Sequence, residues 1–165
     1  MLIAVIAAIG VRAQNYDFSQ RITTGQTLFF KIIDAKAKTA EIVTEVNHYP
    51  YYTTLPCGNI TLPGSIENNG AIYIVTSIGK NAFGYCWDLT GDLIIPDSVT
   101  SIEKYAFGDC SGLTGELIIP DSVTSIGEYA FYGCSGLKGD LKIDKTITTI
   151  GERAFEGCTG LTIKQ

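Results

Sequence analysis

Four of the five cysteines in this 165-residue chain recur at one spacing, which makes them the first candidates for chemistry. Cys86, Cys110, Cys134 and Cys158 are evenly spaced along the chain. Equivalent positions in stacked units are about 5 Å apart, within disulfide reach by distance. This spacing is not a zinc pattern, however, and no histidine accompanies these cysteines. We therefore expect a buried ladder in which each cysteine packs as a small hydrophobic side chain, with disulfides as the alternative.

The stretch "YPYYTTLP" lies between the single histidine, His48, and the fifth cysteine, Cys57. A nucleophilic Cys57–His48 pair is conceivable, but no orienting third group or oxyanion motif accompanies it. We predict no catalytic residue and no enzyme activity, and leave Cys57 either free or paired between molecules. Tyr49, Tyr51 and Tyr52 are interpreted as packing or turn residues, with a carbohydrate-stacking platform as the alternative.

The acidic residues also fail to define a metal or cofactor site. Asp97 and Asp121 occupy equivalent positions at the same spacing as the cysteines, but the series breaks at Lys145. We interpret both as turn-capping residues rather than calcium ligands, and we expect no metal and no cofactor. The net charge is −5 and no cluster of Lys or Arg occurs, so nucleic acid and anionic membranes are not expected as partners.

The elements that position these residues are four copies of one unit. The lines "SIGKNAFGYCWDL", "SIEKYAFGDCSGL", "SIGEYAFYGCSGL" and "TIGERAFEGCTGL" follow each other at this same constant period. One such unit cannot bury its apolar side alone, so a fixed period of this length predicts a solenoid of stacked coils.

One coil is predicted to contain two brief strands. In "GELIIPDSV", Leu117 and Ile119 alternate with outward residues, which indicates a strand, and Pro120 ends it. "VTSI" is the second strand, and a helical or 3₁₀ turn is expected at "GEYAF". The inward residues predicted for one coil are Leu93, Ile95, Val99, Ile102, Ala106, Phe107, Cys110 and Leu113.

The two ends differ from these repeats. Leu2–Val11 is an apolar run too short to span a bilayer, and Val11-Arg12-Ala13 fits a cleavage site. Residues 1–13 are therefore predicted to be a secretory signal peptide, although no basic residue precedes the run; a buried N-terminal strand is the alternative. Residues 14–59 are predicted to form a β-rich cap over the first coil. Residues 60–165 hold four clear repeats and an incomplete fifth, "LTIKQ".

The line "LIIPDSVTSIGEYAFYGCSGL" and its siblings resemble the BspA-like leucine-rich repeat family. The chain departs from the pattern at Asp144-Lys145, where other repeats have Pro-Asp, and at Trp87-Asp88, where others have Ser/Thr-Gly. The resemblance implies a right-handed leucine-rich repeat of 24-residue coils, β-rich, with short parallel strands. It also implies a secreted or surface-anchored protein of host-associated bacteria, or of protists with similar surface proteins, that acts in adhesion.

The remaining candidate site is the outward side of the first strand of each coil. Exposed isoleucines beside an acidic row indicate a protein-binding face, although isolated exposed apolar residues are ordinary. The expected partner is a host or neighbouring-cell protein, such as a matrix glycoprotein, with no membrane insertion after signal cleavage. The alternative is a structural spacer in a larger surface protein, which the ragged "LTIKQ" favours. The candidate binding residues are Asp92, Ile94, Glu116, Ile118, Asp140 and Lys142.

Overall fold

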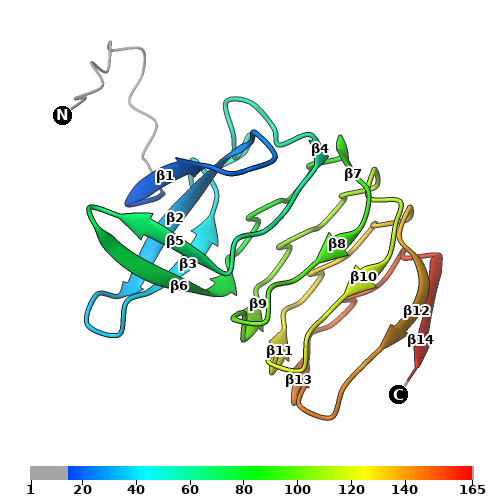
Figure 1. Ribbon diagram of the computed structural model, residues 1–165. Helices are drawn as coiled ribbons and strands as arrows, with labels where there is room; N and C mark the ends of the chain where they lie inside the picture. Colours follow the sequence, from blue (N-terminus) through cyan, green and yellow to red (C-terminus); the bar gives the residue numbers. More distant parts are fainter. Residues whose placement is uncertain (1–14, 165) are drawn as a thin grey trace.

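The computed structural model describes residues 15–164, so the predicted signal peptide of residues 1–13 lies outside the described residues. The regular elements of the described part are strands (Figure 1). The first six are β1 (Phe18–Arg21), β2 (Thr27–Asp34), β3 (Thr39–Val43), β4 (Gly58–Asn59), β5 (Ser65–Asn68) and β6 (Ala71–Ile78). The others are β7 (Leu89–Thr90), β8 (Leu93–Ile94), β9 (Ser101–Ile102), β10 (Leu117–Ile118), β11 (Ser125–Ile126), β12 (Lys138–Lys142), β13 (Thr149–Ile150) and β14 (Gly160–Lys164).

The longest sheet joins the N-terminal strands to the repeats. Its order is β1-β2-β3-β6-β9-β11-β13, with β5 also paired to β6. From β6 onward the pairing is parallel and in register, at Ser77↔Ser101, Ser101↔Ser125 and Ser125↔Thr149. Each step along the sheet equals one sequence repeat, so the period of the sequence is also the period of the structure.

A second row of short parallel strands lies across the repeats from this sheet (Figure 1). β8 pairs with β10 at Leu93↔Leu117 and Ile94↔Ile118, again at an offset of one full repeat. The last pair departs from this offset, because β12 and β14 pair at Leu141↔Ile163, which are less than one repeat apart. The second row therefore loses its exact period at the C-terminal end.

The expected helical or 3₁₀ turn at "GEYAF" is wrong, since no helical element occurs in residues 15–164. Backbone bonds from Gly108 N–H to Tyr105 O (3.1 Å) and from Cys110 N–H to Phe107 O (3.2 Å) close single turns instead. Tyr105 and Asp109 have φ of 55° and 59°. A left-handed residue at each of these positions stops a right-handed helix from propagating, and the next repeat does the same at Tyr129 (φ 56°).

The core follows the predicted inward positions. All eight inward residues predicted for the coil from Leu93 to Leu113 are buried. The phenylalanine rings form one stack, with centroid distances of 5.1 Å for Phe83–Phe107, 5.4 Å for Phe107–Phe131 and 5.3 Å for Phe131–Phe155. Their planes lie within 6° of parallel. Ile119 departs from the prediction because it is only half-buried.

The N-terminal residues form three hairpins, the first of which pairs β1 with β2. β2 and β3 pair antiparallel around the turn at "DAKAKT", where Asp34 Oδ1 accepts hydrogen bonds of 2.8 Å from Lys36 N–H and Ala37 N–H. β5 and β6 form the third hairpin, whose turn uses Asn69 and Gly70 at positive φ. β3 then pairs parallel to β6, so these residues share a sheet with the first repeat. The domain boundary between residues 59 and 60 stays a prediction.

Candidate binding surface

The candidate surface is the outward side of β8 and β10, together with the start of β12. Leu93 and Leu117 point into the core, so the alternation of a strand turns Ile94 and Ile118 outward. Their exposed fractions are 56% and 46%, and they are direct partners in the parallel pair. Two large apolar side chains are thus held next to each other in contact with solvent.

The acidic row beside these isoleucines is partly used by the fold. Asp92 Oδ1 accepts a hydrogen bond of 2.9 Å from Glu116 N–H in the next repeat. A Cβ atom on Gly115 would lie 2.0 Å from the same oxygen, so the glycine makes room for this carboxylate. Asp92 is therefore a structural residue as well as a surface one, whereas the side chain of Glu116 is exposed.

The charged residues of β12 have partners within the chain. Asp140 forms an ion pair with Lys164 of β14. Lys142 Nζ lies 3.6 Å from Asp144 Oδ2, and its side chain is 79% exposed. Asp140, Lys142 and Lys164 are largely exposed, so solvent screens both pairs and each contributes little to stability.

Four of the six predicted residues meet at a shallow hollow of about 180 Å³. Glu116, Ile118, Asp140 and Lys142 line it, whereas Asp92 and Ile94 are not among its lining residues. Lys138, which the sequence did not single out, also lines it. The shift of register at β12 pairs Lys138 with Glu116 at less than one full repeat, and no pattern that follows the repeat could have revealed this.

The cysteines of the ladder are buried and form no disulfide bond in the described residues. Among the described residues all five cysteines are free, and those of the ladder are buried while Cys57 is exposed. The thiol of Cys110 donates to Phe83 O (2.9 Å) and that of Cys134 donates to Phe107 O (3.0 Å), each across one repeat boundary. Burial, with a smaller contribution from Asp88, raises the pKa of Cys86 to about 12. The ladder thus joins neighbouring coils, and the thiol of Cys86 stays protonated near neutral pH.

The structure separates His48 from the surroundings of Cys57. Cys57 lines a hollow of about 610 Å³ with Arg21 and Gln26, and His48 is not among its lining residues. The His48 ring instead lies beside Asn47, with Nδ1 3.2 Å from Asn47 Oδ1. Residues 15–164 also contain no group of three or more His, Cys, Asp or Glu side chains arranged to hold a metal ion.

The tyrosines of the same stretch have different environments. Tyr52 is buried, and its hydroxyl donates to Ala82 O in the first repeat. Tyr49 is 63% exposed and makes edge contacts with Tyr51 and with Tyr85, at centroid distances of 6.0 and 5.7 Å. Tyr52 is therefore a packing residue that attaches the N-terminal hairpins to the repeats.

These features define a repeat protein with short parallel strands, and the comparisons with known proteins agree. The family model described as "BspA type Leucine rich repeat region" matches residues 76–164 with six copies. The chain belongs to this family, as its repeat motif predicted.

Solved leucine-rich repeat proteins share the fold at low sequence identity. A protein from Bacteroides ovatus is 24% identical, with a TM-score of 0.55, and the match covers 90% of this chain and 40% of that one. A protein from Bacteroides capillosus is 22% identical, with a TM-score of 0.60, and the match covers 89% of this chain and 99% of that one. The T. pallidum leucine rich repeat protein is 20% identical, with a TM-score of 0.59 and coverages of 84% and 68%. A search of curated proteins found no match.

The described residues include no apolar helix with the length needed to span a bilayer.

Proposed function

We propose that this chain is a non-enzymatic binding module, secreted or held at the cell surface, that adheres to a protein of a host or of a neighbouring cell. Its repeats form a right-handed solenoid, and its contact surface is the outward side of β8, β10 and β12. The observation that carries the proposal is the adjacent exposure of Ile94 and Ile118, at 56% and 46%, beside the hollow lined by Glu116 and Asp140. Protein interfaces combine such an apolar centre with a polar rim.

Membership of the BspA-type family supports a role in binding rather than in catalysis. The structure supports it further, since repeated coils place like side chains at fixed intervals along a continuous face. Such a face suits contact with an extended protein surface, and a matrix glycoprotein is the expected partner.

Surface plasmon resonance with immobilised fibronectin, fibrinogen, laminin and collagen tests the proposal. We expect saturable binding of the purified protein, and a loss of affinity of about tenfold or more in the variant Ile94→Glu/Ile118→Glu. The matched control is Ile33→Glu/Ile72→Glu, which changes two isoleucines of β2 and β6 that are 54% and 60% exposed. This control should bind like the parent protein.

A structural spacer is the second candidate. It is favoured by the charges near the candidate surface that the fold itself uses, since Asp92 caps the next repeat and Asp140 pairs with Lys164. If the folded protein binds none of the four matrix proteins, the spacer is the better description. If the double variant binds as tightly as the parent, the assigned surface is wrong.

A further inference from the structure

A second hollow, independent of the strand surface above, lies where β3, β6 and β9 end. Its volume is about 550 Å³, within the usual range for small-molecule sites. Parallel strands bring their carboxyl ends to one edge of a sheet, and the residues that follow them collect there. Here β6 is followed by Lys80 and Asn81, and β9 by Lys104 and Tyr105, while Lys31 reaches the hollow from β2.

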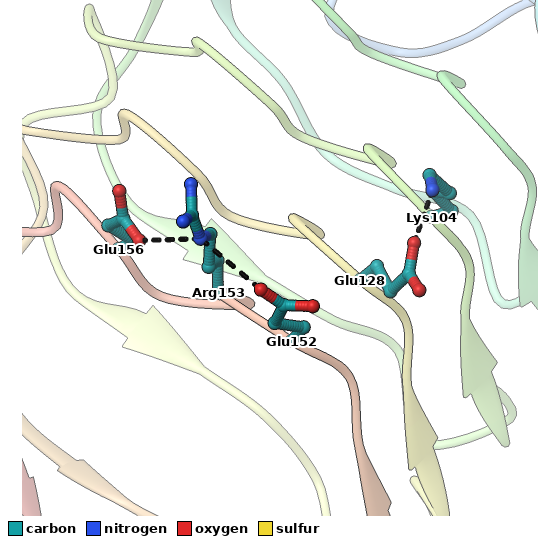
Figure 2. Close-up of polar contacts among 5 residues, drawn as sticks. All are labelled: Lys104, Glu128, Glu152, Arg153 and Glu156. Atoms are coloured by element: carbon teal, nitrogen blue, oxygen red, sulfur yellow. Dashed lines mark hydrogen bonds and ion pairs between the residues drawn. The ribbon is translucent and has the colours of Figure 1, made fainter.

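Three lysines line this hollow although the protein carries a net charge of −5. Lys104 is paired with Glu128, as Figure 2 shows. Neither Lys31 nor Lys80 has an acidic partner within 4.0 Å in the part of the chain that the structure describes. Both have exposed side chains and are accessible to an anion. Lys31 lies opposite Glu41 in the pair of β2 and β3 and interacts with its charge, so Lys80 is the less compensated of the two.

At one turn position of the repeats, positive charge occurs only in the two repeats next to the N-terminal hairpins. The equivalent positions of the four repeats hold Lys80, Lys104, Glu128 and Glu152 in that order. Figure 2 shows how the last three follow one another along the turns, with Arg153 between Glu152 and Glu156. At this position an anion meets an unpaired lysine only in the first repeat, because Lys104 is paired with Glu128 and the last two positions hold glutamates.

The other polar groups of the hollow are neutral hydrogen-bonding side chains. Asn15, Asn47 and Asn81 all line it, and the amide of Asn15 donates to Thr44 Oγ1 at 2.9 Å, which holds this side chain in place. The ring of Tyr105 is fixed by stacking on Tyr129, with centroids 4.8 Å apart and planes 2° from parallel. Amide groups and an oriented aromatic ring are suited to sugar hydroxyls and to the apolar side of a sugar ring.

The hollow is also lined by one acidic residue, Glu41. Glu41 accepts a hydrogen bond of 3.2 Å from Ser77 Oγ, and burial raises its pKa. A Cβ on Gly79 would lie 2.8 Å from Glu41 Cδ, so the glycine leaves room for this side chain. A carboxyl group beside the lysines accepts hydrogen bonds from hydroxyl groups and disfavours a doubly charged phosphate, whose usual partner, arginine, is not among the lining residues.

From this arrangement we propose that the hollow binds an acidic saccharide. Lys31 and Lys80 take its carboxylate or sulfate group, and the asparagines, Glu41 and Tyr105 take the hydroxyls and the sugar ring. This site lies on a different row of strands from the proposed protein-binding surface of β8, β10 and β12. Each proposal can therefore be tested independently of the other.

Isothermal titration calorimetry on the full chain tests the site with three tetrasaccharides. Hyaluronan tetrasaccharide carries carboxylates alone, chondroitin sulfate tetrasaccharide carries carboxylates and sulfates, and chitotetraose is neutral. We expect at least one acidic probe to bind at least tenfold more tightly than chitotetraose, and the stronger of the two identifies the anionic group. Binding should weaken as sodium chloride is raised from 50 to 500 mM.

The variant Lys31→Gln/Lys80→Gln should lose at least tenfold in affinity for the acidic probe. The matched control is Lys36→Gln/Lys145→Gln, which removes the same charge from exposed lysines outside the hollow and should retain binding within about twofold. An equal loss in both variants would reveal attraction by overall charge and overturn the proposal. Preference for chitotetraose, no effect of the Lys31/Lys80 change, or no binding of any probe at 10 mM would overturn it too.

Discussion

The N-terminal hairpins and the repeats both form β-sheet, but they pair their strands in different ways. Up to β6, long strands pair mostly antiparallel, with shifts of register between β2 and β3 and between β3 and β6. In the repeats the same contact recurs at every step. Thr100 N–H bonds to Thr76 O, Thr124 N–H to Thr100 O and Thr148 N–H to Thr124 O, at 2.8, 2.9 and 2.9 Å.

This difference decides where unlike side chains can meet. The hollows of about 610 and 550 Å³ both include residues of the N-terminal hairpins, whereas the hollow bounded by repeats alone has about 180 Å³. Stacked coils place each residue against its own equivalent, which favours flat rows. Varied chemistry is therefore concentrated within the irregular region and where this region contacts the first repeats.

The largest expected effect tests how strongly a residue in the repeats depends on its neighbours in the stack. Phe107 is fully buried between the rings of Phe83 and Phe131, whereas Phe155 is only partly buried and contacts one of these rings. We expect Phe107→Ala to lower the free energy of unfolding by about 3–5 kcal/mol. Phe155→Ala, at the end of the stack, should cost less than half as much. Urea unfolding followed by circular dichroism measures both, and equal costs would contradict the dependence on neighbours.

A smaller effect is expected from the close approach of one coil to the next. A Cβ on Gly136 would lie 2.3 Å from Leu113 O and 2.6 Å from Ser111 O, both backbone atoms. Gly136→Ala should therefore destabilise the protein by about 1–3 kcal/mol, because the two coils must move apart. Thermal unfolding measures the change.

The matched control for this change is Gly84→Ala in the first repeat. Its added Cβ would lie 3.4 Å from Asn81 O, an ordinary contact, and the equivalent positions already hold Tyr132 and Glu156. This variant should range from unchanged to about 1 kcal/mol more stable. A destabilisation as large as that of Gly136→Ala would show that loss of glycine, rather than crowding, is responsible.

The sequence predicted the repeats better than their turns or their junction with the hairpins. Period and alternation place inward residues because every coil obeys the same packing. The turn was expected to be helical or 3₁₀ because "GEYAF" needs a compact backbone, and only the folded structure reveals the positive φ of Tyr105 and Asp109 in the equivalent turn. At the departure of Asp88 the neighbour in the stack is the short strand β4, where Gly58 N–H donates to the Asp88 carbonyl (2.8 Å). The equivalent residue, Gly112, instead packs against a full repeat.

The two candidate sites also differ in how far the sequence could predict them. Ile94 and Ile118 were found because both obey the period. The lysine-lined hollow was missed because Lys31 lies in a hairpin that does not repeat, and because the parallel pairing of β3 with β6 has no signal in the sequence. Contacts between regions that differ in pattern are the ones that a repeat cannot predict.

The smallest expected effect is a pH dependence of stability, which a buried thiol of the repeats should cause and an ordinary packing residue should not. The pKa of Cys86 rises from 9.0 to about 12 in the folded protein, chiefly through burial. Above pH 9 the unfolded chain therefore releases a proton that the folded chain keeps. Stability from this thiol is fully present below pH 9 and is lost as the pH rises toward 12, by at most about 1.4 kcal/mol per pH unit.

Urea unfolding of the parent protein and of Cys86→Ala between pH 8 and 10.5 measures this dependence. The variant should be less stable at pH 8 but should lose stability less steeply above pH 9, because one titrating thiol is gone. Val99→Ala, which removes buried apolar atoms without a titratable group, should lower stability equally at each pH and keep the parent slope. Parallel curves for all three proteins would mean that the buried thiol is not what couples stability to pH. A shallower curve for Cys86→Ala alone would show that Cys86 stabilises its coil only while its thiol is protonated.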